Sequence, residues 1–559
     1  MLRYSLAGCF AGLLCAQSIV SVSGLRFLPG KLRHYCSITS DPSPQVCIPF
    51  PLPLVKKEAK SPDLSDMDSQ GLQDVFDALA VLQDSYYDAV NGTWPTSIDW
   101  TGAVIETVLS GTLSTLTRSL NSEHVGGDAQ RKQRENLISS LYAQVVHSFF
   151  GQNAIAIKNQ AYDDILWVVL GWIEAIKELN QALQNMPWQG YNWFCTFAER
   201  AREFWDLATH GWDTLLCGGG MVWNPRLEPY KNAITNELWI AASIAMYENF
   251  PNDTFREAWV ASKGFPTRDP VYLAAAVEGY KWLKQVNMTN QRGLYVDGYH
   301  IDNNKPNNVK CDARDEMVYT YNQGVILTGQ RGLWAVTGSH SYLEEGHSLI
   351  QSVIKATGWD LLPPWHGLGR GGILEEMCDA SGTCSQDGQT FKGIFFHHLT
   401  AFCAPIEAAG VATHGTRVSL EQHAHVQAAH GKACRAYLSW VKHNARAALG
   451  TRDERGRFGM WWGAIVFSQP AVSKFTDGID HEAPNATDYR NEGTPRDAVW
   501  GKNHRVPDEA RAWGKSTDKR STDKRDDDPN NRGRGRTVET QAGGLALLRA
   551  YWEISQQQW

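Results

Sequence analysis

This 559-residue chain is organised around one stretch, Asn159-Gln160-Ala161-Tyr162-Asp163-Asp164-Ile165-Leu166-Trp167. The consecutive carboxylates Asp163 and Asp164 stand directly before apolar residues with helical spacing, at Ile165, Val169, Trp172, Ile173 and Ile176. The pair therefore lies at a predicted helix N-terminus, where an aspartate commonly caps free backbone N–H groups. The alternative is a pair of carboxyls that work together as nucleophile and acid/base catalyst. The pair alone does not decide between the two.

Helical periodicity recurs along most of the chain. A first pattern starts at Leu72, and further helices are expected at about 100–120, 134–149, 163–185, 192–209, 231–248, 270–286, 320–337, 341–357, 392–409, 417–445 and 539–556. Almost no segment alternates with a period of two, and short links alternate with long loops rich in Gly, Pro, Asn and Asp. A dozen helices in one array predict an all-α fold, an (α/α)6 toroid built from six helical hairpins.

The two ends of the chain and one internal segment differ from this array. Residues 1–24 carry Arg3, an apolar run and small residues, which is typical of a secretory signal peptide. Residues 25–69 lack periodicity, and we expect an arm or pro-segment before a single catalytic domain over 70–559. Within that domain, about 515–536 repeats Ser-Thr-Asp-Lys-Arg and has almost no apolar residues, which predicts a disordered insertion.

Composition narrows the class of protein. A net charge of −7 favours neither nucleic acid nor an anionic membrane surface as a partner. No segment after the signal is apolar enough to span a membrane, and Leu545–Trp559 lacks the hydrophobic tail of a GPI signal. The 22 Trp are a weak hint of carbohydrate stacking. N-glycosylation acceptors, which suit a secreted protein, stand at Asn91, Asn252, Asn287 and Asn485.

Nine cysteines remain once the signal is removed, and in an oxidising compartment most should pair. Cys378 and Cys384 close a short loop and form the most plausible local disulfide. The histidines show no metal-binding pattern. His397 and His398, for example, are adjacent in a predicted helix, so their rings point about 100° apart. We therefore expect neither a metal nor any other cofactor.

Several ordered motifs resemble glycoside hydrolase family 76, the fungal and bacterial endo-α-1,6-mannanases. The resemblance rests on Asp163-Asp164, on Cys217-Gly-Gly-Gly-x-x-Trp223, on Tyr230-Lys-Asn-x-Ile-x-Asn236, on Asp297-Gly298 before Cys311, on Thr320-Tyr-Asn-Gln-Gly324, and on Cys378-x5-Cys384 with Thr390-Phe-Lys-Gly393. The chain departs from the family where Glu237-Leu238-Trp239 replaces Gly-Leu-Phe and where Ile165 replaces Gln. Six blocks in order are much more specific than any one of them.

The resemblance implies an (α/α)6 barrel that hydrolyses α-1,6-mannosidic bonds with retention. Asp163 would be the nucleophile and Asp164 the acid/base, which requires that the two carboxyls have different pKa values. Substrate contacts are expected from residues that stack on sugar rings or bind their hydroxyls: Trp167, Trp223, Lys231, Asn232, Asn236, Asp297, Tyr321 and Asn322.

The expected function is therefore that of a secreted, monomeric glycosidase acting on α-1,6-linked mannan of fungal-type cell walls. Two alternatives stay open. A transglycosylase would use the same covalent intermediate to move mannose-containing (GPI-type) glycans onto cell-wall polysaccharide. A toroid could also bind glycans without turning them over. A terpene cyclase would need Asp-Asp-x-x-Asp to hold magnesium, and position 167 is Trp.

Overall fold

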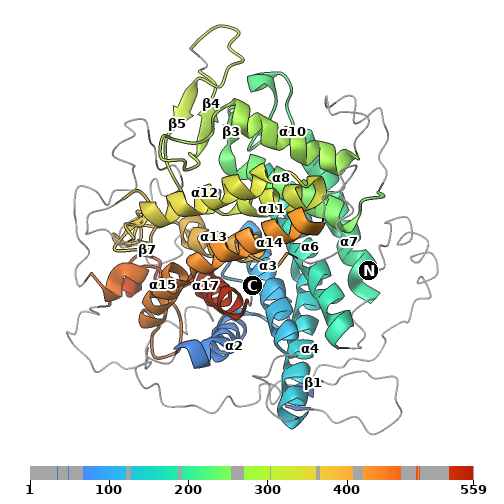
Figure 1. Ribbon diagram of the computed structural model, residues 1–559, viewed down its shortest axis with the longest axis vertical. Coiled ribbons are helices and arrows are strands. Elements are labelled where there is room, and N and C mark those ends of the chain that lie inside the picture. The colour runs from blue at the N-terminus through green and yellow to red at the C-terminus, as the bar shows by residue number, and fades with distance from the viewer. Residues whose placement is uncertain are drawn as a thin grey trace.

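The computed structural model describes residues 34–35, 48–49, 67–120, 128–186, 192–253, 263, 270–302, 304–359, 366–406, 420–467, 486, 488, 490 and 528–557. Most of this part of the chain is helical (Figure 1). The α-helices are α2 (Met67–Tyr86), α3 (Asp99–Ser119), α4 (Asp128–Gly151), α5 (Ala154–Ile157), α6 (Tyr162–Asn185), α7 (Phe194–Ala208), α8 (Ala233–Asn249), α10 (Val271–Gln285), α11 (Val325–Thr337), α12 (Ser341–Ala356), α13 (Gln386–Phe402), α14 (Leu420–Ala436), α15 (Leu438–Gly450) and α17 (Val538–Gln556).

Six of these helices form a closed inner ring. Helix α3 packs on α6, α6 on α8, α8 on α11, α11 on α13 and α13 on α17, and α17 returns to α3. A second layer covers the ring: α4 packs on α3, α7 on α6, α10 on α8, α12 on α11, α15 on α17 and α2 on α17. Figure 1 shows α3, α13 and α17 near the centre and α2, α4 and α10 toward the periphery. The predicted all-α, (α/α)6 architecture is confirmed.

Burial distinguishes the two layers. In α8 every residue from Ala233 to Tyr247 is buried, and α13 and α17 are buried almost throughout, as expected for helices that other helices surround. Small residues allow the closest approaches between neighbours. A Cβ atom on Gly393 of α13 would lie 2.6 Å from the Cα atom of Gly543 in α17, so the two backbones touch there.

Most helix boundaries follow the periodic pattern, but α4 begins at Asp128, six residues before its predicted start, and α11 begins at Val325, five residues after its predicted start. Two other helices also differ. Helix α13 begins at Gln386, about six residues before the predicted start, because Ser385 caps it by accepting a hydrogen bond from the backbone N–H of Gly388. The predicted helix over 417–445 is two helices, α14 and α15, which break at Tyr437. The predicted extension of α13 to 409 falls partly outside the described residues, and the helix ends at Phe402.

Short strands and 3-10 helices lie in the connections between helices. Strands β3 (Tyr230–Asn232), β4 (Gly298–His300) and β5 (Ala313–Asp315) form an antiparallel sheet in that order, with Asn232 opposite Gly298 and Gly298 opposite Asp315. The other elements are β1 (His34–Tyr35), β2 (Ile48–Pro49), β6 (Gly369–Arg370), β7 (Ile373–Leu374), η3 (Thr209–Gly211), η4 (Leu216–Gly218), η5 (Tyr321–Gln323), η6 (Trp462–Ile465) and η7 (Pro529–Asn531). The sheet was not predicted, because three-residue strands carry no readable alternation.

The remaining predictions about domain organisation have different outcomes. The signal peptide at 1–24 and residues 515–527 lie outside the described residues. Disorder is wrong for 528–536, where Asn530 is buried and its side-chain oxygen accepts a hydrogen bond from the N–H of Trp461 at 2.8 Å. Arg536 also forms an ion pair with Asp528. Buried polar contacts order this segment although it lacks apolar residues.

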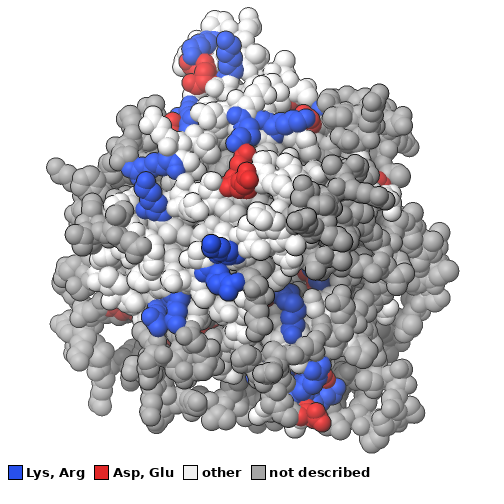
Figure 2. Space-filling view, viewed as in Figure 1, with Lys and Arg blue, Asp and Glu red and all other residues white. Residues whose placement is uncertain are grey.

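Two further observations concern the protein's surroundings. None of the described helices is long and apolar enough to cross a membrane. On the face shown in Figure 2, Lys and Arg side chains lie in separate groups, some of them next to Asp or Glu, among the residues that the structure describes there. That distribution gives no support to a nucleic-acid partner.

Candidate active site

The two consecutive aspartates occupy the first turn of α6, as predicted, and their side chains have different partners. Asp163 is buried, and its Oδ1 accepts a hydrogen bond from the backbone N–H of Asp164 at 3.1 Å. Its Oδ2 accepts another, from the indole N–H of Trp223 at 3.1 Å. Asp164 is partly exposed, and its Oδ2 accepts a hydrogen bond from the backbone N–H of Ala161, the N-cap residue, at 3.1 Å. Asp164 therefore does take part in helix capping.

The surroundings give the two carboxyls unequal acidity. Burial raises the pKa of Asp163 to about 6, against the opposing charge of Arg490 and the two hydrogen bonds. Burial also raises the pKa of Asp164 well above its usual range, and the negative charge of Asp163 raises it further. Asp164 therefore has the higher pKa of the pair, so Asp163 is the carboxyl that ionises first.

A strained glycine-rich loop places Trp223 against Asp163. Residues 217–220 all have positive φ angles, and a Cβ atom on Gly220 would lie 2.4 Å from the ring of Trp282. The carbonyl of Trp223 also accepts a hydrogen bond from the N–H of Tyr162 at 2.9 Å, which joins the loop to the start of α6. The loop is further fixed by the Cys217–Cys311 disulfide.

Lys231 holds this loop from inside the protein. It is fully buried, and its ammonium donates to the carbonyl oxygens of Asp213 at 3.1 Å, Leu216 at 2.6 Å and Gly219. Because its donors are taken up by the backbone, Lys231 supports the loop in this structure, and its contact with substrate stays a prediction. Burial lowers the pKa of this lysine to about 8.

Asn236 and Asn232 also have structural partners. The side chain of Asn236 exchanges hydrogen bonds with the backbone of Met221, at 2.7 and 3.1 Å, so its predicted contact with substrate is not supported. Asn232 caps α8 by accepting from the N–H of Thr235 at 3.3 Å, while its buried Nδ2 has no partner. Trp167 is 3% exposed and stacks on Trp100 with ring centres 5.8 Å apart, which is a core position.

A second group of predicted residues is buried but lacks partners. Asp297 accepts a hydrogen bond from the Tyr230 hydroxyl through Oδ2, while its Oδ1 has none. The hydroxyl of Tyr321 and both amide atoms of Asn322 are likewise buried without a partner. Unsatisfied polar atoms in a protein interior are uncommon and need a partner such as water or a ligand. These three residues therefore fit a polar ligand.

One charged residue of this group was missed by the sequence reasoning. The guanidinium of Arg490 lies over the ring of Trp223, with Cζ 5.0 Å from the ring centre, and interacts electrostatically with Tyr321, Asp297 and Asp163. Arg490 comes from the long loop over 452–514, which carries no periodic or motif signal. Only the folded structure brings it to the aspartate pair.

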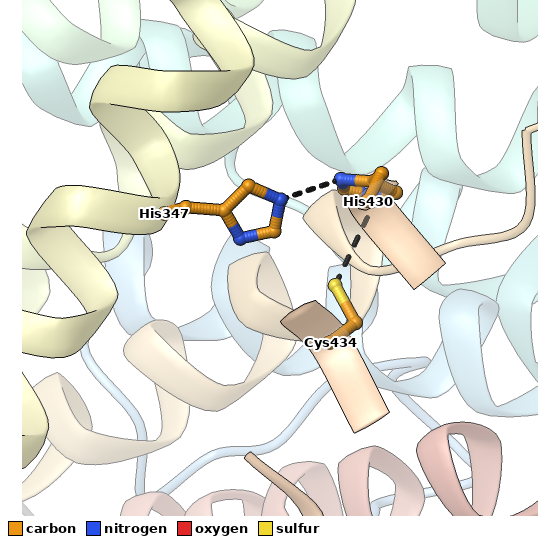
Figure 3. A group of neighbouring side chains, drawn as sticks. All are labelled: His347, His430 and Cys434. Carbon is orange, nitrogen blue, oxygen red and sulfur yellow. Dashed lines mark hydrogen bonds between the residues drawn. The ribbon is translucent and has the colours of Figure 1, made fainter. Parts of the chain in front are cut away.

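Two clusters offer the atom types that metals prefer, and neither is a metal site in this structure. Figure 3 shows His347, His430 and Cys434, with His347 Nε2 2.9 Å from His430 Nδ1. Cys434 is bonded to Cys403, so it has no thiolate to offer. The second cluster contains Cys378 and Cys384, which form the disulfide expected from their spacing.

Of the predicted glycosylation acceptors, Asn91, Asn252 and Asn287 are exposed, and Asn485 lies outside the described residues.

Sequence relatives carry one common description. Mannan endo-1,6-alpha-mannosidase DCW1 of Saccharomyces cerevisiae is 25% identical over 273 residues, which is 46% of this chain and 51% of the relative. Mannan endo-1,6-alpha-mannosidase DFG5 of the same yeast is 24% identical over 287 residues, 48% of this chain and 53% of the relative. The matches therefore span about half the length of these curated relatives.

Solved structures with a similar fold have low sequence identity. An inactive variant of the alpha-1,6-mannanase GH76A of Salegentibacter sp. HEL1_6, in complex with alpha-1,6-mannotetrose, is 16% identical with a TM-score of 0.48, covering 87% of this chain and 99% of that one. Dfg5 from Chaetomium thermophilum, in complex with glucosamine, is 14% identical with a TM-score of 0.47, covering 87% and 92%. Residues 86–454, about two thirds of the sequence, match the sequence model described as Glycosyl hydrolase family 76. This chain therefore belongs to glycosyl hydrolase family 76.

Proposed function

We propose that this protein is a retaining glycosidase that cleaves α-1,6-linked mannan, with Asp163 as nucleophile and Asp164 as acid/base. One observation carries the proposal: two consecutive carboxyls in the first turn of one helix have different hydrogen-bond partners, and their surroundings raise the pKa of Asp164 above that of Asp163. A retaining mechanism with a covalent intermediate needs two carboxyl groups of different pKa. The ionised one attacks the anomeric carbon, while the protonated one donates its proton to the leaving oxygen. The positive end of the α6 dipole and the Trp223 N–H both favour the ionised form of Asp163.

In the first step an oxygen of Asp163 forms a bond to the anomeric carbon of a mannose. The bond from that carbon to the glycosidic oxygen breaks, and the oxygen takes the proton of Asp164 and leaves as an alcohol. In the second step Asp164, now ionised, removes a proton from a water molecule, whose oxygen attacks the same carbon. Asp163 is released as a carboxylate, and the two inversions together retain the configuration.

The residues around the pair would hold the sugar. Trp223 offers a half-buried aromatic face beside Asp163, suitable for packing against a sugar ring. Asp297, Tyr321 and Asn322 supply the unpartnered oxygens and nitrogens that sugar hydroxyls need. Among the described residues Nδ2 of Asn232 has no partner, so its amide NH2 group can serve the same purpose, whereas Lys231 and Asn236 support the site from behind.

We further propose that residues 70–559 act as one catalytic domain, secreted as a monomer toward the cell wall after removal of residues 1–24. The expected partner is α-1,6-mannan or a mannose-containing glycan. This setting follows from the signal-like N-terminus, from the exposed acceptors Asn91, Asn252 and Asn287, and from the disulfides, which persist in oxidising compartments.

The test is incubation of the purified protein with unbranched α-1,6-mannan, following products by chromatography and the anomeric configuration by NMR. The expected result is a set of shorter oligosaccharides that first appear as the α-anomer. Initial release of the β-anomer would refute a retaining mechanism. Longer products without net release of reducing ends would instead identify a transglycosylase.

A further inference from the structure

The backbone that carries Arg490 is held by a residue of the connection that leads into α11. The hydroxyl of Tyr319, a fully buried side chain just before η5, donates to Oδ1 of Asp488 at 2.7 Å. The same hydroxyl accepts a hydrogen bond from the backbone N–H of Arg490 at 3.3 Å. One tyrosine therefore fixes two positions of this segment, and Arg490 enters the site from a defined direction.

The Arg490 guanidinium lies among the groups of the candidate site. It covers the indole of Trp223, and that indole donates to Asp163. Its charge also interacts with Asp297, which lies before β4, and with Tyr321 of η5. The cation is therefore shared between two carboxylates from separate parts of the chain, and it reduces the repulsion between them.

One edge of this guanidinium has no partner. The N–H groups of Arg490 Nε and Nη2 are buried and donate no hydrogen bond to any residue that the structure describes. In an arginine side chain these two N–H groups point in nearly the same direction, so together they bind two oxygens that lie side by side. A buried, unpaired guanidinium edge is costly, which indicates that a ligand completes it.

The neighbouring unpartnered atoms indicate what kind of ligand this is. Asp297 Oδ1 is an acceptor, Asn322 offers both a donor and an acceptor, and the Tyr321 hydroxyl can serve as either. A pair of adjacent hydroxyls accepts from Arg490 and donates to such acceptors at the same time. A carboxylate or phosphate would match the arginine edge but would face Asp163 and Asp297, so an anion is disfavoured.

We propose that Arg490 is a specificity-determining residue that binds two adjacent hydroxyl oxygens of the sugar ring seated against Asp163, using its Nε and Nη2 groups. This inference rests on the proposed function and extends it, because it names the part of the sugar that the enzyme recognises. It also adds to the substrate site a residue that is far in the sequence from Asp163, Trp223 and Asp297.

The positive charge of Arg490 has a separate effect on the nucleophile. The groups that face Asp163 are Arg490, Asp164, Trp223 and Tyr321, and Arg490 is the only cation among them within the described residues. Replacing Arg490 by a neutral side chain should raise the pKa of Asp163, so the acidic limb of the kcat/KM profile should move to higher pH. Lysine in its place keeps the charge but lacks the two-pronged edge.

The experiment uses an α-1,6-mannotrioside with an aryl leaving group, together with three deoxy analogues. Each analogue lacks one hydroxyl of the mannose ring that carries the aryl group, at position 2, 3 or 4. The wild type should lose kcat/KM by about 10- to 100-fold when a contacted hydroxyl is removed. Arg490→Lys should have a reduced kcat/KM on the parent substrate, and its kcat/KM should differ by less than about threefold between the parent and each analogue. Its pH profile should stay that of the wild type. Arg490→Gln should lose discrimination and also shift the acidic limb.

Arg455→Lys serves as the matched control, because Arg455 is exposed in the same long loop and should leave all these values unchanged. Equal discrimination by wild type and Arg490→Lys would overturn the inference. If the wild type turns over no α-1,6-linked substrate, the proposed hydrolase fails separately. In that case the affinities of the wild type and Arg490→Lys for the parent and its analogues are compared by calorimetry. If the wild type binds none of these oligosaccharides, both the proposed function and the role of Arg490 are overturned.

Discussion

The hydrogen bond between Trp223 and Asp163 gives a test of the acid/base assignment that leaves both carboxyls in place. Trp223→Phe keeps an aromatic ring but removes the N–H that donates to Oδ2 of Asp163 at 3.1 Å. A hydrogen bond to a charged group contributes about 1.5–3 kcal/mol, and water in the vacated space recovers part of it. A net loss of about 1.4 kcal/mol raises the pKa of Asp163 by about one unit.

The size of the effect depends on pH in a calculable way. Asp163 has a pKa of about 6, and the substitution should bring it to about 7 because the ionised form loses a donor. At pH 5 the ionised fraction then falls by about tenfold, whereas at pH 8 it changes by about a tenth. The acidic limb of the kcat/KM profile should therefore move to higher pH while activity at alkaline pH stays close to that of the wild type.

The assay is the pH profile of kcat/KM on an α-1,6-mannan oligosaccharide. Trp282→Phe is the matched control, because the Trp282 indole donates to the carbonyl of Cys217 at 3.2 Å, in the same loop but not to a carboxylate. This variant should be less stable without any shift of the acidic limb. An unshifted Trp223→Phe profile, or an equal shift in both variants, would refute the reasoning.

Other substitutions separate chemistry from support. Asp163→Asn should reduce kcat by about 10³-fold or more on every substrate. Asp164→Asn should reduce kcat by about 10²–10⁴-fold on mannan but by much less on an aryl mannoside, whose leaving group needs no proton. If Asp164→Asn reduced kcat equally on mannan and on the aryl mannoside, the assignment of Asp164 as acid/base would be contradicted. Lys231→Met should lower the free energy of unfolding by about 3–5 kcal/mol, measured by denaturant titration, since three carbonyls lose their donor; a raised KM at unchanged stability would support a substrate role for Lys231. Gly220→Ala should destabilise by about 2 kcal/mol or more, because its φ is positive and Trp282 fills the space; a neutral effect on the unfolding midpoint would argue against this loop geometry.

The sequence was sufficient for the helices because helical spacing is a local property. The inner helix α6 was predicted within a residue or two of its observed start at Tyr162, and Asp163 and Asp164 fall in its first turn as expected. The three-residue strands β3, β4 and β5 were not predictable, because their pairing depends on residues that are up to 70 positions apart in the chain.

The roles of individual polar residues depended on tertiary contacts that no local pattern encodes. Lys231 and Asn236 stand in a family motif, yet both bind backbone groups of the glycine-rich loop. Arg490 belongs to a stretch without any pattern, yet its charge acts on Asp163. Glu237, where the family commonly has Gly, is fully buried without a hydrogen-bond partner, and burial raises its pKa well above the usual range.

The closure of the helical ring has a consequence for the order of events during synthesis. Helix α17 fills the gap between α13 and α3, and its Glu539 accepts hydrogen bonds from Thr101 and Gln386, the first of which is 438 residues away along the chain. Contacts so distant in sequence form late in folding. The ring therefore stays open until α17 has left the ribosome, so the helix that joins α13 to α3 is the last part of the ring to pack.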